Sequence, residues 1–256
     1  MSLDNNTKIA IFALTRGYKD TQLYSNLIKR NIKIQEHLLR IIPNAELILF
    51  HEGNISTHDQ EFIINRSNIM IKFIDVREDF KKTKLQKKII LDRKFNHGYR
   101  CMCRFNYYTL WKHLQHYDFV IRVDEDVFIQ SMNIESLEKI FLNNLIFSCI
   151  SLSSETHKYT NKTLPNYLAN VLHSENKNFY NHHFPYTNFY ITKTDFWLSE
   201  EIQFKLKKIK SNPLSYIFRW GDLPVIGSFL NHYNVNINIL ENTSYYHSSH
   251  NQLIEN

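Results

Sequence analysis

The chain has 256 residues, of which 43% are hydrophobic and 22% charged, and its formal net charge is +6. These values are ordinary for a soluble globular protein, and the length allows a single α/β domain with a sizeable core. With only five glycines, the sequence contains neither a GxGxxG nor a GxxxxGK[ST] pattern, which argues against the usual dinucleotide-binding and P-loop folds. No apolar run approaches the roughly 20 residues of a membrane span and no signal peptide is recognisable, so we expect a cytoplasmic protein.

Strands and helices are predicted to alternate through the first half of the chain. The apolar runs that indicate strands lie at residues 8–17, 45–53, 68–76 and 118–130. Helical spacing of apolar residues predicts helices at 20–42, in a lysine-rich segment around 81–88, and at 99–117. This alternation favours an α/β sheet covered by helices on both faces.

The second half is less regular. Residues 151–187 are rich in polar residues, and we expect a loop-heavy acceptor or lid region there. The remaining elements are predicted as a strand within 186–199, a helix at 200–211, a Gly-Asp turn leading into a helix within 216–233, and a last strand within 234–250. Without repeats or a linker, the chain is predicted to be one domain, with a nucleotide-binding part at about 1–130 and an acceptor-side part at about 131–256.

Three polar loops follow predicted strands, at Thr15–Gly17, His51–Gly53 and Asp124–Asp126. In α/β sheets, ligands bind beyond the carboxyl ends of the strands, so these loops are expected to converge. Three adjacent carboxylates in an apolar run would repel one another unless a cation lies between them. Mg²⁺ and Mn²⁺ prefer carboxylate oxygens and share their remaining positions with water and phosphate. Asp124 and Asp126 are therefore candidate ligands, and the alternative is a solvated acidic turn or an N-cap cluster.

Four further residues are candidates for the same site. His247, in a histidine cluster after the last predicted strand, could complete the metal shell, or could be a solvated surface residue. Asp222 could accept a proton from an acceptor hydroxyl, or could cap the helix that follows it. Arg100 and Arg104 lie one helical turn apart and could contact phosphates, or could form a surface pair or an internal salt bridge.

Two lysine-rich runs, at 81–88 and 205–210, carry much of the positive charge. They are typical of solvated helix faces, and the alternative is attraction to phosphate-bearing substrates or to an anionic membrane surface, where the protein would associate peripherally. They lack interleaved stacking aromatics, so we expect no nucleic-acid partner. The cysteines Cys101, Cys103 and Cys149 are expected to be reduced structural thiols.

The segments "YRCMCRF" at 99–105 and "RWGDLPV" at 219–225 resemble the fungal α-1,2-mannosyltransferases of the yeast Golgi. The resemblance implies a GT-A glycosyltransferase fold with a mixed central sheet flanked by helices, Mn²⁺ or Mg²⁺, and a nucleoside diphosphate sugar donor, GDP-mannose in the first instance. It places the family's metal-binding histidine at His247. The "LILFHEGN" segment, which contains Glu52, occupies the place of the family's Asn-Asp-Glu loop.

The sequence departs from that family at two positions. Asp124-Glu125-Asp126 stands where the family has a Glu-Pro motif, and Tyr190 stands at the position of the glutamate proposed as a nucleophile. The reaction is therefore expected to proceed either on one face of the sugar without a protein nucleophile, or by inversion with Asp222 as base.

Together these features predict a metal-dependent glycosyltransferase that moves a mannose-like hexose to a glycan or lipid-linked saccharide. The predicted metal ligands are Asp124, Asp126 and His247. The predicted donor-binding residues are Thr15, Arg16, Arg100, Arg104, Asp124 and Glu125. The predicted catalytic positions are Asp222, Tyr190 and Glu52. The alternatives are a catalytically silent nucleotide-sugar-binding protein of the same fold and a metal-dependent phosphodiesterase or nuclease.

Overall fold

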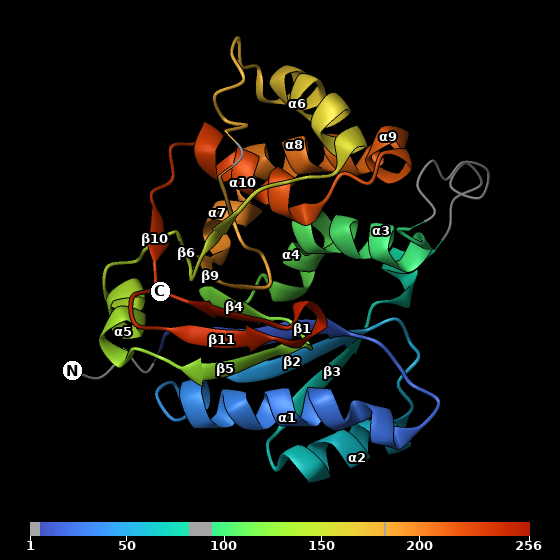
Figure 1. Ribbon diagram of the computed structural model, residues 1–256, viewed down its shortest axis with the longest axis vertical. Coiled ribbons are helices and arrows are strands. Elements are labelled where there is room, and N and C mark those ends of the chain that lie inside the picture. The colour runs from blue at the N-terminus through green and yellow to red at the C-terminus, as the bar shows by residue number, and fades with distance from the viewer. Residues whose placement is uncertain (1–5, 82–93, 182) are drawn as a thin grey trace.

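A computed structural model of the protein describes residues 6–81, 94–181 and 183–256 (Figure 1). The lysine-rich helix predicted around 81–88 lies outside the described residues, apart from Lys81. Within the described part of the chain, no helix is both long and apolar enough to span a membrane.

A seven-stranded mixed sheet forms the centre of the molecule, with strand order β10-β6-β9-β4-β1-β2-β3. Its strands are β1 (Ile9–Thr15), β2 (Glu46–His51), β3 (Ile71–Asp75), β4 (Phe119–Val123), β6 (Phe147–Cys149), β9 (Phe189–Lys193) and β10 (Ile237–Ile239). β4, β1, β2 and β3 run parallel, whereas β9 is antiparallel to both β4 and β6. The mixed α/β sheet predicted from the sequence is confirmed.

Two smaller sheets flank the central one. The first contains β5 (Val127–Ser131), β11 (Ser244–His247) and β12 (Gln252–Glu255), and the second pairs β7 (Leu152–Ser153) with β8 (Phe184–Pro185). The predicted strand at 118–130 is therefore wrong as a single element: it is two strands in two sheets. The break lies at Asp124–Asp126, where the amide of Val127 donates to the carbonyl of Asp124 in a tight turn. The predicted last strand, at 234–250, is likewise divided between β10 and β11.

Helices cover both faces of the central sheet (Figure 1). α1 (Ser25–Ile34) and α2 (Thr57–Ser67) lie on one face, and α3 (His97–Arg104) and α4 (Leu110–Leu114) lie on the other. The remaining α-helices are α5 (Ile134–Leu142), α6 (Lys158–Leu172), α7 (Thr194–Leu198), α8 (Glu200–Ser211), α9 (Pro213–Ile217) and α10 (Asp222–His232). Shorter helical turns lie at Thr21–Tyr24, Gln35–Leu39, Arg77–Phe80, Phe105–Thr109 and Ser248–His250.

The expectation of a loop-heavy segment at 151–187 is wrong, because α6 occupies 15 of these residues. Its buried apolar residues, Leu164, Leu168, Val171 and Leu172, follow helical spacing and form one face. The many polar residues of the segment hide this apolar face in a simple count of composition, so composition alone led to the wrong prediction.

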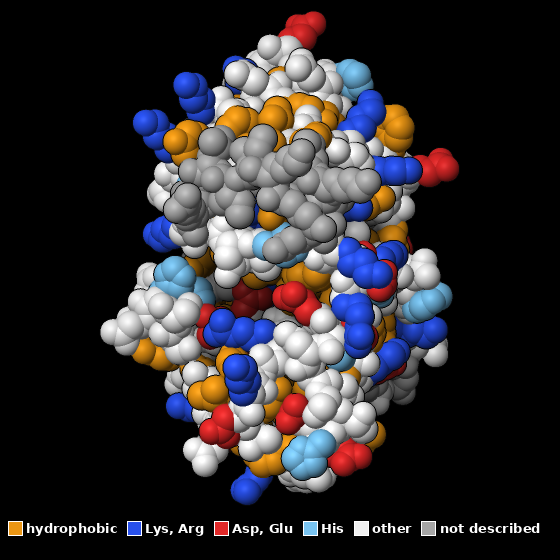
Figure 2. Space-filling view, turned by 90° about the vertical axis from the view of Figure 1, so that its right-hand side faces the viewer, with side chains coloured by type: hydrophobic (Ala, Val, Ile, Leu, Met, Phe, Trp, Pro, Cys, Tyr) orange, Lys and Arg blue, Asp and Glu red, His pale blue; other side chains and the backbone are white. Residues whose placement is uncertain are grey.

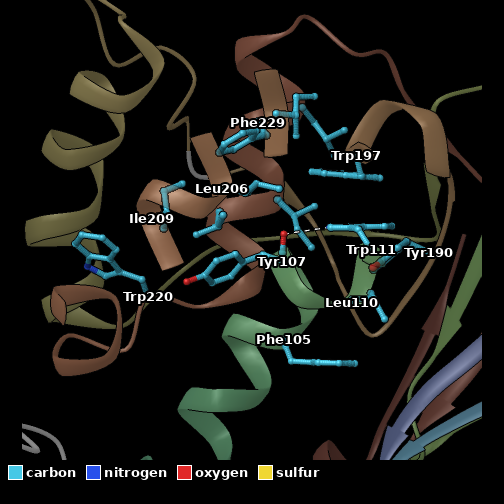
Figure 3. Close-up of a cluster of buried hydrophobic side chains, with 14 of the residues drawn as sticks. Phe105, Tyr107, Leu110, Trp111, Tyr190, Trp197, Leu206, Ile209, Trp220 and Phe229 are labelled. Carbon is cyan, nitrogen blue, oxygen red and sulfur yellow. Dashed lines mark hydrogen bonds between the residues drawn. The ribbon is translucent and has the colours of Figure 1, made fainter. Parts of the chain in front are cut away.

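The strands of the central sheet separate two apolar cores. Along β1, Ala10 and Phe12 pack into the core beneath α3 and α4, and Ile11 packs into the core beneath α1 and α2. Figure 3 shows the first core, in which the rings of Trp111 and Trp197 stack at 5.1 Å with 6° between their planes. Because both indoles are fully buried, they join α4 to α7 at the end of β9.

Replacing Trp111 by Ala is expected to lower the free energy of unfolding by about 3–5 kcal/mol, because a large buried ring would leave a cavity. Urea unfolding measures the loss. Phe204→Ala is the matched control, since this ring on α8 is 58% exposed, and a change below about 0.5 kcal/mol is expected there. Equal losses for the two variants would contradict the assignment of the core.

Candidate active site

The carboxyl ends of the parallel strands β1 and β4 open into a cleft with a volume of about 860 Å³. Figure 2 faces this side of the molecule and shows a hollow between its upper and lower parts, with acidic side chains inside it. The cleft-lining carboxylates are Asp124, Glu125, Asp126, Glu155, Asp222 and Glu255. Clustered carboxylates beyond the strand ends are the arrangement that the sequence predicted for this edge.

Arg122 is the buried counter-ion of this acidic cluster. It lies in β4 with its side chain only 6% exposed. Its Nε and Nη2 donate to the two carboxylate oxygens of Asp124, at 2.7 and 3.1 Å, and its Nη1 donates to Oδ2 of Asp222 at 2.7 Å. One guanidinium therefore holds two carboxylates that are about a hundred residues apart in the sequence.

A second buried arginine lies next to the acidic turn from α1. Arg30 is fully buried, and its Nη2 donates to the carbonyl of Val123, the residue before Asp124. Burial lowers the pKa of Arg30 to about 9, while the neighbouring Asp124 and Glu125 act in the opposite direction. For Asp124, burial raises the pKa although Arg122 opposes this shift. Two protein cations thus stabilise the turn from inside the fold.

Glu125, the middle residue of the turn, contacts the end of β1. The hydroxyl of Thr15 donates to its Oε2 at 2.6 Å, and Nε of Arg16 lies 3.5 Å from its Oε1. Arg16 also donates to the hydroxyl of Tyr18 at 3.0 Å. The structure therefore brings Thr15 and Arg16 together with the acidic turn, as the sequence predicted. Their contact with a nucleotide stays a prediction.

Asp126, the third acidic residue, is paired with His247. Its Oδ2 lies 3.3 Å from Nε2 of His247, whose Nδ1 lies 3.1 Å from both the Tyr186 hydroxyl and the Asn188 amide nitrogen. Burial raises the pKa of Asp126, but hydrogen bonds from His247 and Ser249 outweigh this effect and lower it. The pairing follows from sheet register, because β11 places His247 opposite Val127.

The Asp126–His247 pair has the geometry of two neighbouring metal ligands. Adjacent ligands of an octahedral ion with bonds of about 2.1 Å are separated by about 3 Å, and the observed Oδ2 to Nε2 distance is 3.3 Å. Among the described residues, no group of three or more His, Cys, Asp or Glu side chains could hold a metal ion. The pair therefore suits an ion that completes its shell with water and with oxygens of a ligand.

Asp222 lines the cleft at the start of α10. Its Oδ2 accepts from Arg122 and lies 3.4 Å from the amide nitrogen of Asn106, while its Oδ1 accepts no hydrogen bond from the described residues. The N-cap of the helix is Gly221 rather than Asp222. The alternative that Asp222 is only a capping residue is therefore not what the structure shows.

The structure does not bring Arg100 and Arg104 to the cleft, and their contact with phosphate stays a prediction. Arg100 is 1% exposed, and its guanidinium donates to the carbonyls of Tyr216 and Ile217. Arg104 donates through Nη2 to the carbonyl of Lys210 at 2.8 Å. Neither lines the cleft, and both instead join α3 to the segments around α8 and α9.

Tyr190 and Glu52 also lie outside the described lining of the cleft. Tyr190 is fully buried, its ring stacked on Phe147 and 5.9 Å from the guanidinium carbon of Arg122. It packs under Arg122 and is not among the described residues that line the cleft, and its catalytic role stays a prediction. Glu52 follows β2, outside the cleft lining, with its carboxylate near Gly98. Burial raises the pKa of Glu52, but the structure gives it no contact with the predicted acceptor site.

Sequence reasoning missed four functional candidates: Arg122, Glu155, Asn188 and Arg219. The signal for Arg122 was present, because an arginine inside a buried apolar strand needs a buried partner. Arg219 lies within the "RWGDLPV" motif, yet only Asp222 was selected from it. Asn188 begins the "NFY" segment, of which only Tyr190 was selected, and Glu155 lies in a segment without a distinguishing pattern.

No sequence-family description matches the chain, and no curated protein matches it either. Solved structures do. Core-mannan synthase A (CmsA/Ktr4) of Aspergillus fumigatus, in its Mn/GDP form, matches with a TM-score of 0.75 at 16% identity, over 96% of this chain and 76% of that one. The mannosyltransferase Ktr4p of S. cerevisiae, in complex with GDP, matches with a TM-score of 0.71 at 15% identity, over 95% and 71% of the two chains.

The chain has the GT-A fold of glycosyltransferases. Mouse xyloside xylosyltransferase 1 is a more distant neighbour, with a TM-score of 0.51 at 10% identity over 92% of this chain and 86% of that one. At these identities the likeness establishes the fold. The GT-A fold, the mixed sheet and the similarity to fungal mannosyltransferases that the sequence predicted are confirmed.

Replacing Arg122 by Met is expected to lower the free energy of unfolding by about 3–5 kcal/mol, because two carboxylates would lose a buried partner. Denaturant unfolding at pH 7 measures this. The triple variant Arg122→Met, Asp124→Asn, Asp222→Asn removes the unpaired charges as well and should recover most of the loss. If the triple variant were less stable than the single one, Arg122 would not be the counter-ion of both carboxylates.

Proposed function

We propose that the protein is a metal-dependent glycosyltransferase that moves a hexose from a nucleoside diphosphate sugar to a hydroxyl of a carbohydrate acceptor. The observation that carries this proposal is the Asp126–His247 pair at the carboxyl edge of a GT-A sheet, in one cleft with Asp222. The GDP bound by both fungal neighbours and the manganese of the Aspergillus fumigatus structure support it.

In this proposal, Oδ2 of Asp126 and Nε2 of His247 hold Mn²⁺ or Mg²⁺. The ion supplies charge to the diphosphate leaving group when bound. Asp124 is fixed by Arg122 through both of its oxygens, so its role is to orient water or a donor hydroxyl rather than to supply a free ligand. Thr15 and Arg16 contact the nucleotide from the end of β1. Glu125 holds both side chains in place, by a hydrogen bond from Thr15 and an ion pair with Arg16.

Asp222 is the residue that accepts the proton of the attacking hydroxyl. Its Oδ2 is held by Arg122 at 2.7 Å, and its Oδ1 is available in the cleft. A general base must lie within hydrogen-bond reach of the proton that it removes. The same guanidinium that holds Asp124 thereby sets the position of the base relative to the metal corner.

The donor is proposed to be GDP-mannose, in keeping with the GDP bound by the fungal neighbours. The acceptor is proposed to be a glycan or a lipid-linked saccharide, met in the cytoplasm at a membrane surface. In support, the exposed side of α8 carries Lys207 and Lys208, with Nζ of Lys208 4.4 Å above the ring of Phe204. Basic residues beside an exposed aromatic ring suit an anionic lipid surface.

The alternative of a two-metal phosphodiesterase or nuclease is less well supported. Such enzymes hold two ions about 3.5–4 Å apart, and the described residues contain no His, Cys, Asp or Glu group large enough for that. A catalytically silent binding protein was suggested by the absence of a glutamate at Tyr190. Because Asp222 lines the cleft and is the proposed base, the proposed reaction needs no glutamate at that position.

Incubation with GDP-mannose and Mn²⁺ is expected to release GDP, and EDTA is expected to abolish the release. Asp126→Asn and His247→Ala should each lower turnover by at least about 100-fold, since even outer partners of metal ligands cost about 10–100-fold when removed.

Asp79→Asn is the matched control, because Asp79 and His113 form a similar pair at 3.2 Å and neither lines the cleft. Turnover that survives EDTA, or an Asp126→Asn variant as active as the control, would show that the pair binds no catalytic metal.

A further inference from the structure

Arg219 has a strained backbone at the edge of the cleft. Its φ is +55°, whereas the other described non-glycine residues with positive φ are asparagines and one histidine. A side chain other than glycine or asparagine in the left-handed region costs about 1–2 kcal/mol. Such strain persists only where the surrounding structure imposes it, and it concentrates at ligand-binding sites.

Two aromatic rings and a carboxylate surround the side chain of Arg219 and hold its backbone in this conformation. The guanidinium carbon lies 4.5 Å from the ring centre of Phe95 and 5.1 Å from that of Tyr99. Nη2 donates to the Tyr99 hydroxyl, and Nη1 donates to Oε2 of Glu155 at 2.7 Å. Nε is buried without a hydrogen-bond partner. The side chain is thus held rigidly, with its charge directed at Glu155.

Glu155 is held just as firmly. Its side chain is 6% exposed, its Oε1 accepts from the amide of His157 at 2.7 Å, and yet it lines the cleft. Gly221 makes this approach possible, because a Cβ there would lie 3.3 Å from Oε2 of Glu155 and 3.5 Å from Nη1 of Arg219. Since Gly221 directly precedes Asp222, the Glu155–Arg219 pair lies beside the proposed base.

The charges of the described residues that line the cleft disfavour an anionic acceptor. Among the described residues that line it, two are arginines, Arg122 and Arg219, and six are carboxylates. Both arginines are already paired with carboxylates. The proposed metal would be paired with the donor diphosphate. Among the described lining residues, no unpaired arginine or lysine therefore remains to bind a phosphate or carboxylate on the acceptor.

We propose that Glu155 and Arg219 form the acceptor-binding subsite, which takes an uncharged hexose. Glu155 accepts a hydrogen bond from one ring hydroxyl and Arg219 donates to its neighbour, while the reacting hydroxyl of the same ring lies at Asp222. This inference rests on the proposed function and adds to it the class of acceptor. A buried pair of this kind rejects a sugar that lacks either hydroxyl, because its polar groups would be left unpaired.

The test compares Glu155→Gln with wild type, using uncharged methyl hexosides and the corresponding hexose 6-phosphates as acceptors. The acceptor KM of the variant is expected to rise at least 10-fold. GDP release without acceptor and the Kd for GDP with Mn²⁺ should stay within 2-fold. Asp75→Asn is the matched control, since Asp75 is also paired with an arginine, Arg77, but lies outside the cleft. Its acceptor KM should not change.

Gly221→Ala provides a second variant if Glu155→Gln melts early. Its φ of −72° accepts alanine, and the added methyl would press on Glu155, so the same rise in acceptor KM is expected. Unchanged acceptor KM in both variants, or wild-type preference for the 6-phosphates, would overturn the subsite while GDP release continued. Failure of wild type both to release GDP and to bind it with Mn²⁺ would instead overturn the proposed function and the subsite with it.

Discussion

The guanidinium of Arg122 is the constraint on which the site depends. It is buried in β4, and it holds Asp124 after the same strand and Asp222 at the first turn of α10. A buried charge requires a partner of opposite charge. Because one guanidinium pairs with both carboxylates, its removal would leave two buried negative charges without a partner. The contact therefore fixes the distance between the acidic turn, on the central sheet, and the helix that carries the proposed base. Arg30 contacts the same turn from α1 and stabilises its negative charge.

The three adjacent acidic residues have different partners. Asp124 is compensated by Arg122, and Glu125 by Thr15 and Arg16. Asp126 is paired with His247, whose imidazole nitrogen is a common metal ligand. The turn is thus held by protein contacts, and the proposed metal would bind at one corner of it without being required for folding. Strand pairing between β5 and β11 sets that corner.

Much of the fold could be predicted because its signals are local. Buried strands such as β1 and β2 are continuous apolar runs, and the loops after them had to meet once the strands were parallel. The residue types at strand and helix ends also singled out Asp126, His247 and Asp222, which the fold brings into one cleft. The features that could not be predicted depended on the direction in which a side chain points and on contacts between residues far apart in the sequence. Arg100 and Tyr190 lie in correctly predicted elements, but their side chains face the interior. Glu155 carries no sequence pattern, and its place depends on contacts with Arg219 and with the amide of His157, beside Gly221.

The central claim is that Asp126 and His247 hold a metal ion that carries the donor diphosphate. Crystals grown with Mn²⁺ and GDP, measured at the manganese absorption edge, test it most directly. The account predicts one anomalous peak within bonding distance of Oδ2 of Asp126 and Nε2 of His247, with diphosphate oxygens completing the shell. A manganese peak elsewhere, or GDP bound in the cleft with this corner empty, would contradict it.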